Sequence, residues 1–482
     1  MRPHRSRKSI ARPAPLACAL LVAGSWSLLV APTHTHADPY SVHAEGAVAL
    51  AWTDNAANRP ELVQVAGESL PEAGFFTQLR PSVLFTYEQR RAVHVSAAAL
   101  DINLYETAEP SNSYNGTLSY NGLLLLSPVS ELGLGAALGF GRVDPLDLAQ
   151  ANQVQGNTTF VSTGVTQDLR RQLSADLRVN QGFAYTFVRT NQPTSVVDPN
   201  DPDAPAELVD NFSRAHSVSL TLGGDRTWAR TSLGLVANVN YVGVDQNGDN
   251  IQLINNLSAN VRRDLDPFWS ASATLGVGTI HVLEQPPGME GGDSFGITPT
   301  GSLTANYLRP VGAVTANLSA TVGYTVTPNL LLGNVTNTAN GALSASIPLP
   351  WFRRGPETTV TVASTLAMSH SRPSLQASGD PTWNSYTADG VVSWAAQEGL
   401  NVALRYQFVR TDVFYGDESM ATGDIQPPED FFRHTILVEF NGRYPARPAA
   451  QLPDRSGRRV DLSNEQPIGS DGDQQNEPGQ RR

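Results

Sequence analysis

The chain has 482 residues, of which 16% are charged, and its formal net charge is −12. Forty glycines and only four methionines argue against a helical protein. The scarcity of charged residues argues against a soluble β-sandwich, which would show charges on its outer face. We expect an all-β protein with no nucleic-acid partner.

Residues 1–37 have the organisation of a secretory signal peptide. A positively charged start precedes an apolar stretch from Leu16 to Val30, and Thr35-His36-Ala37 is a small-x-small cleavage site before Asp38. Cys18, the only cysteine, lies at the start of the apolar stretch, whereas a lipoprotein cysteine would follow it. We expect export through the general secretory route and a mature chain without disulfides or thiolate metal ligands.

Apolar side chains occupy every second position on both sides of a short turn between Leu118 and Phe140, "LSYNGLLLLSPVSELGLGAALGF". A period of two is typical of β-strands with two unlike faces. The same alternation recurs along the whole mature chain and predicts about 18 strands (16–18) of roughly 12–16 residues each. The least regular of these runs are Ala92–Tyr105, Thr158–Leu169 and Leu331–Ile347.

We therefore expect residues 38–444 to form a transmembrane antiparallel up-and-down β-barrel of the bacterial outer membrane. The leucine-rich face would contact outer-membrane lipid, and the face of Gly, Ser and Asn would line a water-filled interior. An array of soluble sandwiches would instead leave the apolar faces without partners and the sheet edges open.

Short and long connections alternate along the predicted strands, as periplasmic turns and extracellular loops do in outer-membrane barrels. With an even strand number both termini lie in the periplasm, and Pro348–Pro356 is the one oversized turn on that side. The short connections are Glu88–Arg91, Ser127–Ser130, Asp168–Arg171, Gly224–Thr227, Arg263–Pro267, Arg309–Gly312 and Ala396–Gly399. The long ones are Asp54–Gly74, Val143–Gln155, Asn191–Asn211, Glu284–Asp293, Ser371–Pro381 and Asp412–Asp430.

Aromatic residues gather near the strand ends, where the two interfaces of a bilayer select them. The residues expected at the outer ends are Trp52, Phe75, Tyr105, Tyr114, Tyr324, Trp383 and Phe431. Those expected at the inner ends are Tyr40, Phe85, Trp269, Tyr307, Trp394 and Phe440.

A barrel of this size is wide enough to leave an aqueous lumen. Most residues expected to face it are small and neutral, such as Gly133, Asn180, Asn238, Ser272 and Thr300. The charged residues expected to line it are scattered: Arg80, Asp176, Arg178, Arg262, Asp389, Arg405 and Glu439. They either pair across the lumen and set its shape or form a weak selectivity ring. The pairing interpretation is favoured because no dense cluster of one sign appears.

No constellation of catalytic side chains stands out, since the histidines of the mature chain fall on separate, distant strands. We expect no enzymatic activity, no catalytic residue, no cofactor and no bound metal. The acidic loop Asp198–Asp210 has oxygen ligands suited to Ca²⁺, but proline-interrupted acidic loops are usually solvated. Asp245–Asn250, "DQNGDN", is interpreted as a hairpin turn in preference to a calcium loop.

The last predicted strand contains Thr435–Phe440, which alternates apolar residues and ends on an aromatic. It looks like the recognition strand that the barrel-assembly machinery reads, and we expect that machinery as a partner. Residues 445–482 are rich in Pro, Gln, Asp and Arg and are expected to form a disordered periplasmic tail.

The first hairpin, His43 to Tyr105, joins a strand ending in Thr53-Asp54-Asn55, a strand carrying Leu-x-Pro and a Tyr- and Arg-rich tight turn, "TYEQRRAV". This pattern resembles the outer-membrane β-barrel porin family of the β-barrel porin 2 type, whose members are often linked to exopolysaccharide export. The resemblance covers about the first 65 mature residues. It implies a passive outer-membrane conduit for a secreted polysaccharide, with periplasmic polysaccharide-export proteins as partners.

Two other functions stay open on the sequence. The barrel could be a general diffusion porin for small solutes, or a structural or adhesive barrel that acts through its extracellular loops. A lumen rich in hydroxyl and amide groups suits a sliding sugar chain and neutral solutes equally.

Overall fold

The computed structural model describes residues 40–54, 73–106, 112–142, 159–196, 207–245, 249–284, 295–311, 314–329, 334–349, 360–373, 382–397, 399–414 and 431–444. The chain divides into two units, Met1–Pro39 and Tyr40–Arg482, and every described residue belongs to the second. The expected signal peptide and C-terminal tail therefore lie outside the described residues. Within the described ranges, no helix is long and apolar enough to cross a membrane.

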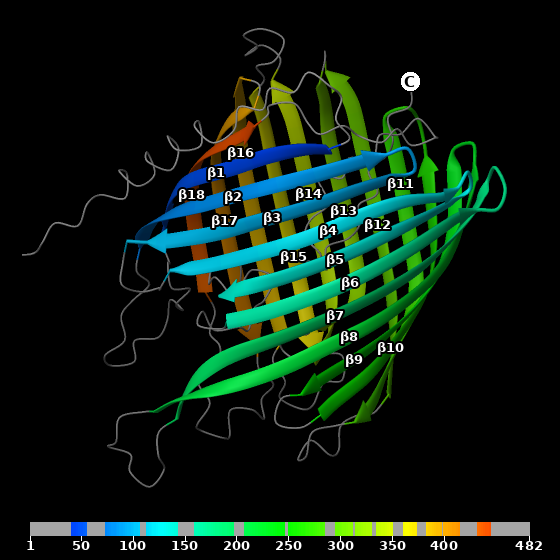
Figure 1. Cartoon of the computed structure of the whole chain (residues 1–482), viewed down its shortest axis with the longest axis horizontal. Coiled ribbons are helices and arrows are strands. Elements are labelled where there is room, and N and C mark those ends of the chain that lie inside the picture. The colour runs from blue at the N-terminus through cyan, green and yellow to red at the C-terminus, as the bar shows by residue number, and fades with distance from the viewer. Residues whose placement is uncertain are drawn as a thin grey trace, which may run out of the picture. The chain divides into compact units, whose positions relative to one another are not determined.

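The described residues form a single 18-stranded sheet (Figure 1). The strands are β1 (Tyr40–Thr53), β2 (Gly74–Gln89), β3 (Ala92–Tyr105), β4 (Ser113–Ser127), β5 (Ser130–Arg142), β6 (Thr159–Gln172), β7 (Leu177–Val196), β8 (Glu207–Trp228), β9 (Thr231–Asp245), β10 (Asp249–Asp264), β11 (Trp269–Glu284), β12 (Phe295–Val311), β13 (Val314–Asn329), β14 (Asn334–Leu349), β15 (Val360–Pro373), β16 (Thr382–Gln397), β17 (Leu400–Phe414) and β18 (Phe431–Tyr444).

Every strand pairs antiparallel with the strands before and after it in sequence, and β1 pairs with β18 to close the ring. At the closing seam Ala44 lies opposite Tyr444 and Thr53 opposite Thr435. The predicted fold class and strand number are thus confirmed: the chain is an all-β antiparallel up-and-down barrel. Closure matters because it pairs the backbone N–H and C=O groups that a sheet edge would leave open to lipid.

Side chains alternate between two unlike faces of the sheet on every strand around the ring. On one face Leu118 lies opposite Leu138, Leu235 opposite Ala259 and Leu343 opposite Leu366. Large apolar side chains on this face stay exposed, for example Leu275 at 72% and Ile297 at 64%. In a closed barrel such a face needs an apolar solvent, so it is the lipid-facing side. The residues between them face the lumen.

The two ends of the barrel differ in their connections. We call the end that carries the β2–β3, β4–β5 and β8–β9 turns the inner rim and the opposite end the outer rim. Tyr40 lies opposite Tyr87 at the inner rim, and Tyr444 lies there too, so the barrel starts and ends at the same rim. Two outer-rim connections are short as well, since β9 and β10 are joined by residues 246–248 and β13 and β14 by residues 330–333. Asp245 pairs with Asp249, while residues 246–248 of the expected hairpin turn lie outside the described residues.

The expected loop Asn191–Asn211 is corrected by the structure. β7 and β8 are 20 and 22 residues long and stay paired up to Val196 and Glu207. The expected strand length of 12–16 residues is wrong for β7 and β8 because cross-strand backbone hydrogen bonds continue after the apolar alternation stops. Most of the acidic stretch expected as a calcium candidate, residues 197–206, lies outside the described residues.

The aromatic girdles are largely placed as predicted, with two corrections at the outer end. Tyr40, Phe85, Trp269, Trp394 and Phe440 are exposed on the lipid-facing side near the inner rim. Tyr105 and Trp383 instead face the lumen: the Tyr105 ring lies 5.2 Å from the Phe76 ring, and Trp383 is 3% exposed. Both stand one position out of phase with the lipid-facing rows of their own strands, so the alternation of each strand places them on the lumen side.

Candidate functional site: the lumen

A continuous wall of hydroxyl and amide side chains faces the lumen from β8 to β15. Asn238 donates hydrogen bonds to Ser219 Oγ and Thr221 Oγ1 at 2.9 and 2.8 Å, on the neighbouring strand. Further links of this kind join Thr300 to Asn256, Thr304 to Thr321, Ser319 to Ser344 and Thr338 to Ser371. This wall is therefore mainly polar and neutral, and its hydroxyl and amide groups hydrogen-bond to one another.

Six arginines that face the lumen each form an ion pair with a carboxylate. Arg80 pairs with Asp101 at 3.1 Å, Arg170 with Asp168 at 2.6 Å, Arg178 with Asp225 at 3.1 Å and Arg262 with Asp264 at 3.8 Å, while Arg443 pairs with Glu45. Arg405 donates to Asp389 at 2.6 Å. Pairing cancels most of the field that these charges would otherwise project into the lumen.

The structure places six of the seven charged residues expected in the lumen on inward-facing strand positions. Arg80, Arg178, Arg262, Asp389 and Arg405 belong to the ion pairs above. Glu439 lies between Ala49 of β1 and Ala403 of β17, and no ion pair is found for it within the described ranges. The seven are spread around the ring, and only Asp389 and Arg405 contact each other.

Asp176 is the exception, because it lies in the turn between β6 and β7 at the inner rim. Its carboxylate accepts hydrogen bonds from the Ser174 hydroxyl at 2.6 Å and from Arg226, on the lipid-facing side of β8, at 2.7 Å. These two donors, the Ser174 hydroxyl first, lower the pKa of Asp176 below its ordinary value. The expected lumen position is thus corrected to an exposed turn position.

Sequence reasoning missed several charged residues of the lumen. Glu45, Asp101, Asp168, Arg170, Asp225, Asp264 and Arg443 all stand in phase with the inward positions of their strands. The position of each residue in the alternation of its strand could have identified it as facing the lumen. Which of them meet depends on the register between strands, which alternation alone does not specify.

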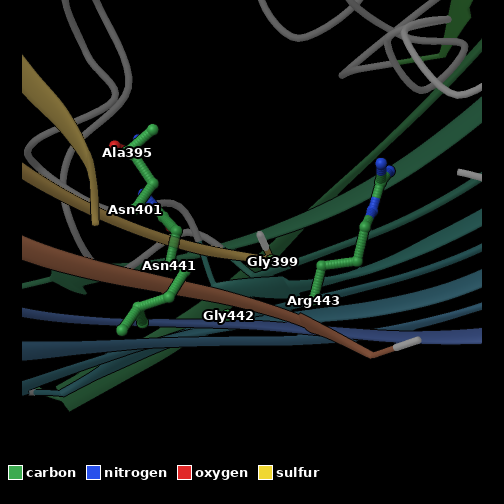
Figure 2. Close-up of a pocket in the computed structure, with 7 residues that line it drawn as sticks. Ala395, Gly399, Asn401, Asn441, Gly442 and Arg443 are labelled. Carbon is green, nitrogen blue, oxygen red and sulfur yellow. The ribbon is translucent and has the colours of Figure 1, made fainter. Parts of the chain in front are cut away.

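A shallow hollow opens beside the seam at the inner rim (Figure 2). It is lined by Ala395, Gly399, Leu400, Asn401, Asn441, Gly442 and Arg443. In Figure 2, Asn401 and Asn441 lie together and Arg443 extends on the far side of Gly442. Arg443, the one charged lining residue, is already paired with Glu45, so the hollow offers two amides and no free charge to a ligand.

Inward side chains near the outer rim, which we call the outer level, are buried from solvent. Most inward side chains near the inner rim are not. On the outer level Thr53, Ala215, Ile280, Trp383, Val409, Thr411 and Arg433 are at most 4% exposed. Toward the inner rim Asn260, Ser270, Asn306, Ser319 and Asn401 are half-exposed, while His43, Thr86, Val93 and Val95 on β1–β3 are buried. The exposed part of the described lumen wall therefore lies mainly toward the inner rim.

The histidines form no catalytic or metal site in the part of the chain that is described, where no group of three metal-ligating side chains occurs. His94, His216, His281 and His434 face lipid and contact aromatic rings, with His94 Nδ1 2.9 Å from the Tyr120 hydroxyl. They extend the aromatic girdles. The absence of enzymatic activity stays a prediction.

Selective removal of one paired charge should change the ion selectivity of the barrel. Arg405→Gln leaves Asp389 as an unpaired inward carboxylate and should favour cations, while Asp389→Asn should favour anions. The reversal potential across a bilayer with a salt gradient measures this. Stability should change by about 1 kcal/mol or less, because the pair is partly exposed. The double variant should restore the original selectivity, and shifts of the same sign in both single variants would contradict the pairing.

No family model and no curated protein matches this sequence. Solved structures with a similar architecture exist. PirA, a siderophore receptor from Acinetobacter baumannii, aligns with a TM-score of 0.43 and 7% identity over 83% of this chain and 80% of its own. A variant of the ferric enterobactin receptor PfeA from Pseudomonas aeruginosa aligns with a TM-score of 0.42 and 9% identity over 83% and 80%. OccAB3 from Acinetobacter baumannii aligns with a TM-score of 0.40 and 10% identity over 84% of this chain and all of its own.

Proposed function

We propose that the protein is an outer-membrane channel that acts as a passive conduit for the secretion of an exopolysaccharide. The observation that carries this proposal is the lumen wall of β8–β15, where hydroxyl and amide groups face the interior and bond to each other. Such groups exchange hydrogen bonds with sugar hydroxyls and with water at similar free energy. A polymer therefore meets no site deep enough to hold it.

The ion pairs support an uncharged or weakly charged cargo. A nutrient porin that selects ions presents rings of unpaired charge. Here the six inward arginines named above are neutralised by neighbouring carboxylates. The covered outer level also favours a regulated conduit over a general diffusion porin, which needs a mouth that is open at rest.

We propose two sets of partners for the same barrel. β18 pairs with both β17 and β1, so the segment Thr435–Phe440 closes the barrel and is the strand that we propose the barrel-assembly machinery reads. The inner rim, where the wall is most open to water, is the end that we propose faces periplasmic polysaccharide-export proteins.

Deletion of the gene tests the function. We expect surface polysaccharide to disappear while uptake of small neutral sugars is unchanged, and the wild-type gene should restore the polymer. Complementation with a barrel that fails to assemble is the control for effects on neighbouring genes. Normal surface polysaccharide together with reduced solute permeability would instead support a porin, and loss of cell adhesion alone would support an adhesive barrel.

A further inference from the structure

The outer end of β13 separates from its neighbour β12. Pairing between β12 and β13 stops at Gly301 and Tyr324, although β12 continues to Phe295 beside β11 and β13 continues to Asn329 beside β14. Pro299 lies in the stretch of β12 that β13 no longer accompanies, and it has no N–H to donate to a ladder. Above Tyr324, β13 therefore pairs with β14 alone, as a hairpin end, while Thr336–Thr338 of β14 remain paired with β15 and Val335 lies just beyond the last of these pairs.

This hairpin end packs inside the lumen. Val335 of β14 is buried in a cluster with Ala215, Val242, Val244, Ile254 and Ile280, and Val326 of β13 packs against the same cluster. The cluster residue nearest to Val335 along the sheet is on β11, three strands away, or about 14 Å at roughly 4.8 Å per strand. A valine side chain cannot reach that far along the wall. The contact is made on the concave side, so the hairpin end folds over the inner face of the neighbouring strands.

The alternation of β13 gives the same result. Val326 continues the row of Val322 and Tyr324, which face lipid lower in the wall. Its contact with inward-facing residues shows that the strand turns inward above Tyr324. A Cβ built on Gly278, an inward position of β11, would lie 3.7 Å from Val326 Cγ2.

The surface that receives the hairpin differs from the rest of the lumen wall. Ala215, Val242, Val244, Ile254 and Ile280 form an apolar patch on β8–β11, and each is at most 5% exposed. Lower on the same strands most inward residues are Ser, Thr, Asn and Gly, and the exceptions are Val236, Asp225, Arg262 and Asp264. An apolar patch inside an aqueous lumen is costly unless it is covered, and Val326 and Val335 cover it.

We propose that the outer ends of β13 and β14 form a latch that closes the outer mouth of the lumen by packing Val326 and Val335 on the apolar patch of β8–β11. This regulation rests on the proposed conduit function. The latch opens when the hairpin end is displaced toward the wall, and the hydrophobic contact returns it to the closed position.

A reversible cross-link tests the latch. Gly278→Cys with Val326→Cys places two thiols next to each other, and an added Cβ at Gly278 makes only ordinary contacts of 3.6–3.7 Å. Cys18 is the only cysteine of the chain, so a protein produced from Asp38 onward has no other thiol. In a planar bilayer the oxidised protein should lose its openings, and reduction should restore them. Gly278→Cys with Val322→Cys is the matched control, since Val322 faces lipid and should not cross-link.

Weakening the contact should have the opposite effect. Val335→Ala removes buried methyl groups and should raise the open probability roughly tenfold over the wild type. Failure of the cross-link to form, or equal conductance before and after reduction, would overturn the latch. These readouts use salt current alone. Suppose the latch gates the current but deletion of the gene leaves surface polysaccharide unchanged. The polysaccharide function would then be rejected and the latch retained.

Discussion

Leu235→Arg should impair assembly of the barrel by about 2–4 kcal/mol, the usual cost of an arginine on the lipid face near mid-membrane. Leu235 lies between Gly224 of β8 and Ala259 of β10 and is 61% exposed on the outer surface. No carboxylate lies opposite it on either neighbouring strand, so an arginine there would be desolvated without a counter-ion.

Asn238→Arg is the matched control, three residues further along the same strand. Asn238 faces the lumen and contacts Ser219 and Thr221, so an arginine there keeps access to water at the loss of two neutral hydrogen bonds. Folding into lipid vesicles, followed by the heat-dependent gel mobility of the folded barrel, compares the two variants. Equal defects at both positions would show that the assignment of the faces is wrong.

Gly276→Ala should destabilise the barrel by about 1–3 kcal/mol, the usual cost of overpacking. Its added Cβ would lie 2.7 Å from the Leu257 carbonyl oxygen and 2.8 Å from Ser258 Cβ, and the backbone there is held by the β10–β11 ladder. Gly278→Ala, on the same face of the same strand, meets nothing closer than 3.6 Å and should be tolerated. Urea titration of the folded fraction measures both, and equal midpoints would contradict the close approach at Gly276.

The strands could be predicted from the sequence because their two faces meet two different solvents. Lipid selects apolar side chains at every second position, and this signal survives even in the least regular runs. Ala92–Tyr105 is β3 with the same bounds, and Thr158–Leu169 and Leu331–Ile347 differ from β6 and β14 by one to three residues at each end. Closure follows, since an open edge in lipid would leave backbone groups unpaired.

The errors all lie at or near strand ends. Tyr105 and Trp383 were expected in the girdle from their position along the strand, but each is one position out of phase with the lipid-facing row of its strand and faces the lumen. The β7–β8 extension was missed because its residues do not alternate, although their backbones still pair. Asp176 was assigned to the strand that begins immediately after it.

The sequence by itself determined the all-β class, a strand number of about 18, the lipid-facing rows and the hydroxyl- and amide-rich composition of the lumen face, because each of these depends only on which residues alternate. The tertiary structure decided which charges meet, as in Arg405 with Asp389 or Arg443 with Glu45, because those contacts depend on the stagger between strands. It also decided that Val326 and Val335 pack on Ile280 and its neighbours. That contact joins strands that are not adjacent in the sheet, so the alternation of single strands does not specify it.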